Sequence, residues 1–236
     1  MQDFITQSII DLFVPNQCIV CQRLNKVNLC GDCIAKIPNN TTLWLKDKPK
    51  TQPLFVPKFN TKIQPPLKDG YIDSILSCSK FSNHIIRKSI HYLKYKNLPQ
   101  IAGPLGSIML RSLSQNLRLK DNIILCPIPL HPNRLKFRGY NQALLLAEYF
   151  HKKLNLDIYN ELYRILDTPH QMKINDRETR IQNMDNAFEA RQKASTDTQS
   201  IILIDDVTTT LSTIQEAAKA LSKVGFNSIN ALVLAH

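Results

Sequence analysis

The stretch Ile201–Thr213, IILIDDVTTTLST, combines a short apolar run, two adjacent aspartates and a turn rich in hydroxyl groups. The apolar residues Ile201–Ile204 indicate a buried strand, which places Asp205 and Asp206 at its carboxyl end. Ligands of open α/β sheets bind at that end of the strands. The turn leads into an expected helix, whose first backbone amides point toward an incoming anion. The stretch therefore predicts a phosphate-binding turn beside two carboxylates that bind sugar hydroxyls or a divalent cation.

Two other interpretations of the aspartate pair are weaker. An apolar strand that ends in aspartate also occurs in P-loop nucleotidases, but these proteins need a G-x-x-x-x-G-K-[ST] loop. None of the six glycines directly precedes a lysine, so the sequence excludes such a loop. An aspartate can also cap the following helix. One acid suffices for a cap, whereas here two acids precede a run of hydroxyl residues.

Strand and helix patterns alternate from residue 71 onward. Apolar runs predict strands at 71–81, 123–126, 162–166, 187–190, 201–204 and 229–234. Helical spacing predicts helices at 85–93, 102–117, 143–154, 175–183 and 213–224. The remaining stretch at 127–142 is expected to be a long loop. The alternation predicts an α/β fold with a mainly parallel sheet covered on both faces.

The pattern along the chain predicts three parts. Residues 1–37 hold a short amphipathic helix and a four-cysteine module. Residues 38–70 are expected to form a proline-rich linker or an extended wrap across the next domain, because six of the thirteen prolines fall between residues 38 and 66. Residues 71–236 form the main domain.

Four of the six cysteines form two C-x2-C pairs, at Cys18, Cys21, Cys30 and Cys33. Two such knuckles bring four thiolates to one tetrahedral ion, and zinc accepts four sulfur ligands without redox change. A disulfide is disfavoured in the cytosol, and a redox motif would not be doubled at this spacing. The spacing therefore predicts a structural zinc site. Cys78 and Cys126 lie among apolar residues and are expected to be small core residues.

The charge of the chain is concentrated in one segment. The formal net charge is +11, from 30 Lys and Arg against 19 Asp and Glu. Eleven basic residues and a single acid, Asp121, lie between Lys80 and Arg138, so this segment carries +10. A dense cationic region binds polyanions such as nucleic acid, phosphorylated metabolites or an anionic membrane face. The alternative is a solvated surface that only aids solubility, and the concentration of charge favours the phosphate-facing role.

The sequence predicts a cytoplasmic protein. Its longest apolar runs are too short to cross a bilayer. Residues 1–3 carry no positive charge, unlike the start of a secretory signal. An amphipathic helix is expected from the spacing of Phe4, Ile5, Ile9, Leu12 and Phe13. Two roles stay open for this helix: packing on its own domain, or a peripheral contact with the inner face of the cell membrane.

The aspartate stretch resembles the phosphoribosyl pyrophosphate motif of type I phosphoribosyltransferases. Further motifs are the four-cysteine module, LKYKN at 93–97, CPIPLHPNRLKFRGYNQA at 126–143, the residues Gln171, Arg177, Arg180 and Asn183, and LIDDVTTT at 203–210. Together they resemble the motifs of the ComF family (ComFC-type competence proteins). The resemblance covers nearly the whole chain and is weakest in the proline-rich segment.

The resemblance implies a type I phosphoribosyltransferase fold, with a phosphoribosyltransferase-like domain at 71–236 and a small N-terminal zinc-binding module. It implies that Asp205 and Asp206 bind the ribose hydroxyls of phosphoribosyl pyrophosphate and stabilise positive charge on the ribose during catalysis. The 5-phosphate would be held by Val207, Thr208, Thr209, Thr210, Leu211, Ser212 and Thr213. Pyrophosphate with magnesium, or nucleic acid, would face the basic residues Lys94, Lys96, Arg134, Lys136 and Arg138.

Leu211 departs from the family pattern, which commonly has glycine at this position. Leucine does not adopt a positive φ without cost. We therefore expect a reshaped phosphate turn, with an effect on affinity or turnover.

Two functions from different classes stay open. The resemblance implies a competence protein of natural transformation that handles incoming single-stranded DNA, carries a phosphoribosyl pyrophosphate site and works with other competence proteins such as a DNA-uptake helicase. Four aromatic residues interleaved with the basic residues could stack on nucleobases: Tyr92, Tyr95, Phe137 and Tyr140. Packing in the core is the expected role of Tyr92 and stays open for Phe137 and Tyr140. The alternative is an active magnesium-dependent phosphoribosyltransferase with an unknown acceptor.

Overall fold

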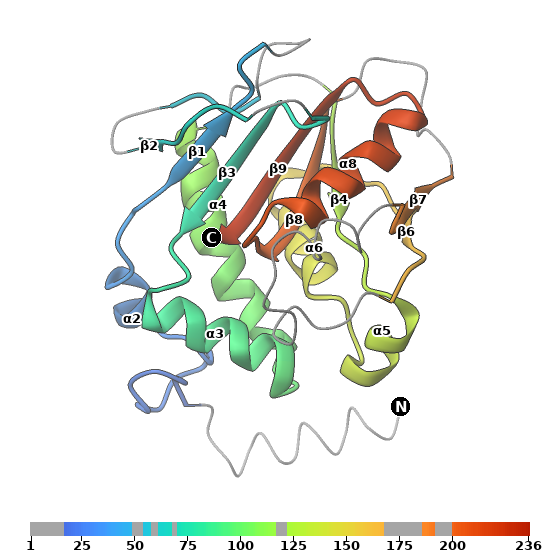
Figure 1. The fold of residues 1–236 in the computed structure, drawn as a ribbon. Helices are drawn as coiled ribbons and strands as arrows, with labels where there is room; N and C mark the ends of the chain where they lie inside the picture. The colour runs from blue at the N-terminus through green and yellow to red at the C-terminus, as the bar shows by residue number, and fades with distance from the viewer. Residues whose placement is uncertain are drawn as a thin grey trace.

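The computed structural model describes residues 17–48, 54–57, 61–67, 70–116, 122–167, 186–191 and 200–236. The expected helices near the N-terminus and at 175–183 lie outside these residues, as do Gln171, Arg177, Arg180 and Asn183. Within the described residues the chain forms an α/β structure around a seven-stranded, mostly parallel sheet (Figure 1). This architecture confirms the fold class that the alternation of strands and helices predicted.

The sheet has the strand order β2-β1-β3-β9-β8-β4-β5. Its strands are β1 (Thr42–Leu45), β2 (Lys62–Ile63), β3 (Ser74–Ser79), β4 (Ile123–Pro127), β5 (Asp157–Ile158), β8 (Ser200–Val207) and β9 (Ser228–Ala235). Only β1 and β3 pair antiparallel, and the other neighbours run parallel. A separate antiparallel ribbon consists of β6 (Leu162–Arg164) and β7 (Phe188–Ala190).

Helices cover both faces of the sheet, as its central strands require. Ile202 and Ile204 of β8 belong to one core, which includes the inward faces of α3 (His84–Tyr95), α4 (Ala102–Asn116) and α6 (Gln142–Leu154). Ile201 and Leu203 belong to a second core with α8 (Ser212–Lys223). Because both faces of β8 are buried, its sequence is a continuous apolar run instead of an alternating one.

The expectation of a loop throughout residues 127–142 is wrong, because α5 (Pro132–Arg138) occupies its middle. Pro132 lies in the first turn, where a missing N–H costs nothing. The backbone N–H of Asn133 donates to Nδ1 of His131, at 3.3 Å. Gly139 ends the helix in the left-handed region, with φ +83°. These are ordinary helix start and stop signals in a segment too short to show helical periodicity.

The described parts of residues 38–70 lie along the sheet. They contribute β1 and β2 at its edge, and the backbone N–H of Leu54 donates to Oδ1 of the buried Asn230, at 3.4 Å. Prolines are tolerated next to short strands near the edge of a sheet. The high proline content of this segment therefore did not exclude strands β1 and β2. A further short helix, α2 (Gly31–Ala35), and the 3-10 turn η1 (Pro99–Ile101) complete the described elements. In the part of the chain that is described, no helix has the length and apolar character needed to cross a bilayer.

Candidate functional site

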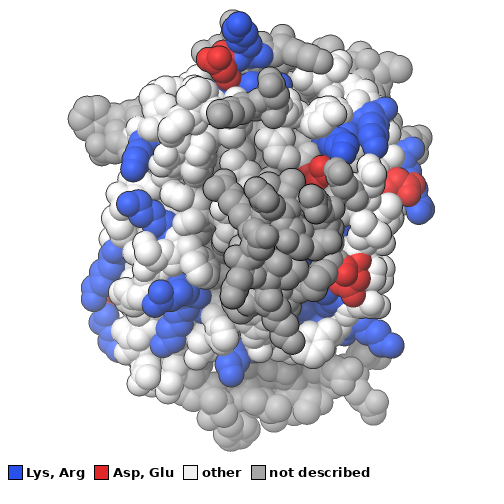
Figure 2. All heavy atoms as spheres, viewed as in Figure 1, with Lys and Arg blue, Asp and Glu red and all other residues white. Residues whose placement is uncertain are grey.

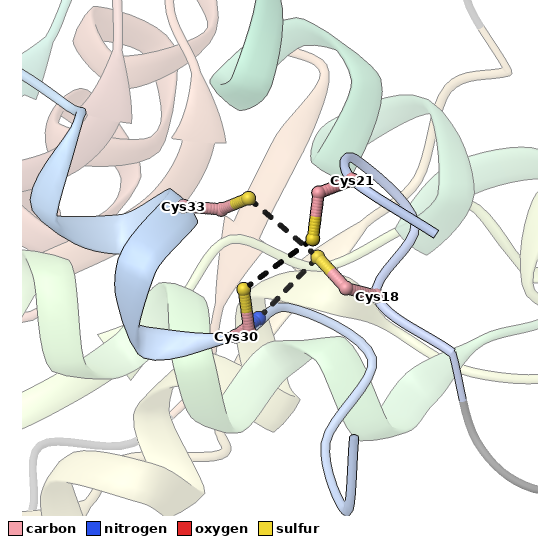
Figure 3. A group of neighbouring side chains, drawn as sticks. All are labelled: Cys18, Cys21, Cys30 and Cys33. Carbon is pink, nitrogen blue, oxygen red and sulfur yellow. Dashed lines mark hydrogen bonds between the residues drawn. The ribbon is translucent and has the colours of Figure 1, made fainter. Parts of the chain in front are cut away.

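Four cysteine side chains near the N-terminal end of the described chain converge on one point (Figure 3). The Sγ atoms of Cys18 and Cys33 are 3.7 Å apart, as are those of Cys21 and Cys30. All four sulfurs lie within 4.8 Å of one another. Tetrahedral zinc with Zn–S bonds of about 2.3 Å requires sulfurs roughly 3.8 Å apart, whereas a disulfide requires about 2.0 Å. The cluster can therefore hold a metal ion such as zinc.

Local backbone geometry shapes the cysteine cluster. The first knuckle closes through a hydrogen bond from the Gln22 N–H to the Cys18 carbonyl, at 2.8 Å, and Gln22 takes a φ of +61°. Hydrogen bonds from the backbone and guanidinium of Arg23 lower the pKa of Cys21 to about 6. Burial raises the pKa of Cys33 to about 12. A bound cation would supply the charge that stabilises its thiolate.

A cleft of about 160 Å³ lies at the carboxyl ends of β4 and β8. It is bounded by α3, α5, the start of α6, β6 and the start of α8. Its lining consists of Lys94, Tyr95, Ile128, Pro129, Leu130, Arg134, Arg138, Asn141, Gln142, Arg164, Asp205, Asp206, Val207 and Thr213. Seven of these were predicted from the sequence to contact a phosphoribosyl ligand: Lys94, Arg134, Arg138, Asp205, Asp206, Val207 and Thr213.

The two aspartates differ in environment although they are adjacent. Asp206 is 4% exposed, and its Oδ2 lies 2.7 Å from Nζ of Lys94 at the end of α3. The Asp206 N–H donates to Oδ1 of Asp205, at 2.8 Å. Burial and the neighbouring charge of Asp206 raise the pKa of Asp205 to about 8. Burial opposes the charge of Lys94, but the fields of Asp206 and Asp205 outweigh it and raise the pKa of that ammonium.

The basic residues predicted for this site divide into two groups. Arg134 and Arg138 lie one turn apart on α5 and both line the cleft. Lys136 lies between them on α5, is exposed and does not line the cleft. Lys96 is likewise exposed and outside the lining. Burial lowers the pKa of Arg138, whose guanidinium lies 5.6 Å from the ring centroid of Tyr95.

The cleft also contains functional candidates that sequence reasoning missed. Arg164 reaches it from β6, and its guanidinium lies 5.5 Å from the Phe188 ring of β7. Burial, together with the positive charge of Arg134, lowers the pKa of Arg164. The only sequence signal was a basic residue inside a short strand pattern. The approach of the β6–β7 ribbon to the main sheet is a tertiary feature.

Hydrogen bonds join the elements around the cleft. The hydroxyl of Tyr140 donates to the carbonyl of Leu93, at 2.7 Å, beside Lys94 in the chain. The Asn141 amide donates to the Ile128 carbonyl, at 3.0 Å, while its Oδ1 accepts from the N–H of Ala143 and caps α6. Tyr140 is therefore engaged in structure, where the sequence left base stacking open. These contacts fix α3 and the start of α6 relative to each other.

In the turn after the aspartates, Leu211 takes the left-handed conformation that was expected to be costly for leucine. Leu211 precedes α8 with φ +60° and packs against the core on the α8 side of the sheet. It does not line the cleft, whereas Val207 and Thr213 do. Thr208 is nearly buried and its N–H donates to the Ala235 carbonyl, at 3.0 Å. The hydroxyls of Thr210 and Ser212 are 2.8 Å apart. The leucine thus leaves the cleft open.

Comparison with known proteins finds relatives that match part of the chain. No family model matches the chain. Over 124 residues, which are 52% of this chain and 53% of the relative, it is 36% identical to Competence protein F of Haemophilus influenzae. Over about half of its length the chain is thus similar to Competence protein F, in line with its resemblance to the ComF family.

Other relatives match a slightly larger part of the chain. DNA utilization protein YhgH of Escherichia coli (strain K12) is 31% identical over 142 residues, or 58% of this chain and 60% of the relative. The same protein of Salmonella typhimurium is 30% identical over the same shares. The chain thus spans only between half and two thirds of these relatives' own lengths.

Proposed function

We propose that the cleft binds phosphoribosyl pyrophosphate with magnesium, in a protein that handles single-stranded DNA during natural transformation. The observation that carries the first part is the charge arrangement of the cleft. Two carboxylates at the end of β8, one of them paired with Lys94, share a cleft of about 160 Å³ with the cations Arg134, Arg138 and Arg164. A ligand with a vicinal diol at one end and several phosphates around it matches this separation of charge.

Each end of the ligand has suitable partners in the chain. Asp205 and Asp206 accept hydrogen bonds from the ribose hydroxyls, and they offer the carboxylate oxygens that magnesium prefers. The 5-phosphate lies at the start of α8, where Leu211 provides no side-chain cap to compete for the first amides. Arg134 and Arg138 face the pyrophosphate. Magnesium, when bound, neutralises part of the pyrophosphate charge.

The DNA part of the proposal is supported by the relatives and by the surface around the cleft. The relatives' names are Competence protein F and DNA utilization protein. Lys96 and Lys136 are exposed beside the cleft, and Phe137 on α5 is 89% exposed. Exposed cations bind the strand's phosphates, and an exposed ring stacks on its bases. Other competence proteins, such as a DNA-uptake helicase, and a peripheral membrane contact complete the proposed setting.

Isothermal titration tests the phosphoribosyl site. Phosphoribosyl pyrophosphate with magnesium should bind the parent protein and should show at least a hundredfold loss of affinity in the Asp205→Asn/Asp206→Asn variant. Lys152→Glu/Lys153→Glu, at exposed positions of α6, serves as the control and should bind as the parent does. Equal affinity in the aspartate variant and the parent would contradict the site.

An active phosphoribosyltransferase is the second candidate. The aspartates that bind the ribose also lie where positive charge develops when pyrophosphate leaves, so they can stabilise that charge. Pyrophosphate release that needs magnesium, and that disappears in Asp205→Asn/Asp206→Asn, would establish catalysis. If the protein binds phosphoribosyl pyrophosphate but releases no pyrophosphate with nucleic acid or nucleobase acceptors, the site has a binding role and no catalytic one.

A further inference from the structure

The exposed face of α3 carries a stripe of two cations and three ring-bearing side chains, Arg87 and Lys88 with His84, His91 and Tyr95, that leads to the cleft. Helical spacing places residues three, four and seven apart on one side of a helix. His84, Arg87, His91 and Tyr95 follow this spacing, and all four are exposed. Lys88, beside Arg87, is partly exposed. The opposite side of α3 is buried in the core through Ile85, Ile86, Ser89, Ile90 and Leu93.

Negative charge is missing from this helix. The sequence from Lys80 to Lys120 contains no Asp or Glu, so no acid of α3 itself offsets the stripe. Lys and Arg side chains gather over α2 and α3 at the lower left of Figure 2. A face of one sign of charge on a helix about 18 Å long suits an extended polyanion better than a single small anion.

The stripe continues into the cleft through Tyr95. One turn back, the ring of His91 lies 5.3 Å from that of Tyr95. On the cleft side the guanidinium of Arg138 lies 5.6 Å from the same ring. Tyr95 and Arg138 both line the cleft. Lys94, next to Tyr95 in the chain, reaches Asp206 at 2.7 Å. The helix face and the cleft are thus one continuous surface.

We propose that single-stranded nucleic acid lies along the α3 face, with its end at the mouth of the cleft against Tyr95 and Arg138. This inference rests on the proposed function, because it names the second ligand of the same cleft. Arg87 and Lys88 contact backbone phosphates, while the end of the strand shares Arg138 with the pyrophosphate-binding region. Strand and phosphoribosyl pyrophosphate therefore weaken each other's binding.

Fluorescence anisotropy with a labelled single strand of about 20 nucleotides tests the path. Arg87→Glu/Lys88→Glu should weaken binding at least tenfold. It should also make the slope of log affinity against log salt shallower by about 1.4, since each lost phosphate contact of a single strand contributes about 0.7. The control Lys152→Glu/Lys153→Glu makes the same change of net charge on α6 and should alter the affinity less than about threefold.

The outcomes separate this inference from the proposed function. If the α3 variant binds the strand as tightly as the parent, or if both variants lose equally, the strand does not follow α3. A parent protein that binds no strand overturns the inference as well. Titration of phosphoribosyl pyrophosphate into the α3 variant should give the parent's affinity. Failure of that ligand to bind any form contradicts the phosphoribosyl site, while the anisotropy still decides the α3 path.

Competition between phosphoribosyl pyrophosphate and the strand tests whether the strand continues from α3 into the cleft. Saturating phosphoribosyl pyrophosphate with magnesium should weaken strand binding by the parent severalfold. An unchanged strand affinity would end the path on α3 and overturn the contact with Arg138.

Discussion

At the scale of single residues, the cleft contains a carboxyl group, that of Asp205, whose pKa is raised. Burial and the charge of Asp206 raise the pKa of Asp205 to about 8. Lys94 pairs with Asp206 at 2.7 Å, so the cation neutralises one acid more directly than the other. The proposed ligand must therefore meet a protonated Asp205 near neutral pH, and magnesium binding to that carboxyl releases a proton.

The proton release gives a pH dependence. Below about pH 8 the carboxyl of Asp205 must ionise before it binds magnesium, so the affinity for phosphoribosyl pyrophosphate with magnesium should rise about tenfold per pH unit and level off above about pH 8. Calorimetric titration between about pH 6 and about pH 9 measures this slope. Asp205→Asn, which binds more weakly, should lose the slope. A flat profile in the parent would show that Asp205 does not bind the metal ion as a carboxylate.

Leu211 offers a second test at this scale. Its φ of +60° costs a residue with a Cβ about 1 kcal/mol relative to glycine. Leu211→Ala and Leu211→Gly both lose the packing of the leucine against the core, but only glycine also loses the strain. Urea unfolding should therefore give Leu211→Gly about 1 kcal/mol more stability than Leu211→Ala. The reverse order would show that the turn relaxes out of the left-handed region in these variants.

The aspartates and the neighbouring arginines were predictable to different degrees. An apolar run before two acids fixes their place at the end of a strand, because both faces of that strand must be buried. Arg134 and Arg138 were predicted near the site together with Lys136. Only the helical spacing of α5 shows that the two arginines face the cleft and Lys136 does not. Arg164 depends on the docking of the β6–β7 ribbon, which no local pattern encodes.

At the scale of elements, the sequence predicted the long buried elements and the short strands β6 and β7, but it missed other short elements. The strand expected at 201–204 is extended to Ser200–Val207, with the aspartates inside its last residues. Helix α5 was missed because seven residues are too few for hydrophobic periodicity, and none of them is buried. The edge strand β2 and its neighbour β1 were missed because their pairing partners are distant in sequence.

The contact between α4 and α6 depends on a glycine. A Cβ placed on Gly106 would lie 2.5 Å from Cδ1 of Tyr149, whereas a Cβ on Gly103, in the same helix, would meet nothing within 4 Å. Gly106→Ala should therefore lose about 1–2 kcal/mol through forced movement of the ring. Gly103→Ala should gain about 0.5 kcal/mol from helix propensity. Chemical unfolding of both variants measures the difference, and equal values would mean that Tyr149 moves aside without cost.

At the scale of the whole molecule, the cysteine cluster is part of the main core. Cys18, Cys30 and Cys33 belong to the same buried cluster as the inward residues of α4 and α6. The N-terminal module and the α/β domain therefore share one hydrophobic core instead of forming two separate ones. A change at the cluster should be transmitted to the sheet.

Removal of one cysteine tests this coupling. Cys30→Ala should abolish bound zinc and lower the stability of the whole domain by about 4 kcal/mol or more, because metal binding and folding are linked. Cys126→Ala, in the buried strand β4, removes the same side chain from the other core and should leave zinc content unchanged. Zinc analysis and thermal unfolding give both values. If Cys30→Ala loses zinc but the domain keeps its stability, the cysteine cluster does not stabilise the core of the α/β domain.

The position of β9 in the sheet has a consequence for biosynthesis. Strand β9, at 228–235, lies between β3, at 74–79, and β8, at 200–207. A ribosome delivers the two outer partners first and the strand between them last. Until residues 228–235 emerge, β3 and β8 expose edges that can pair with other chains. A nascent chain stalled before that point should thus engage chaperones or aggregate instead of folding partially.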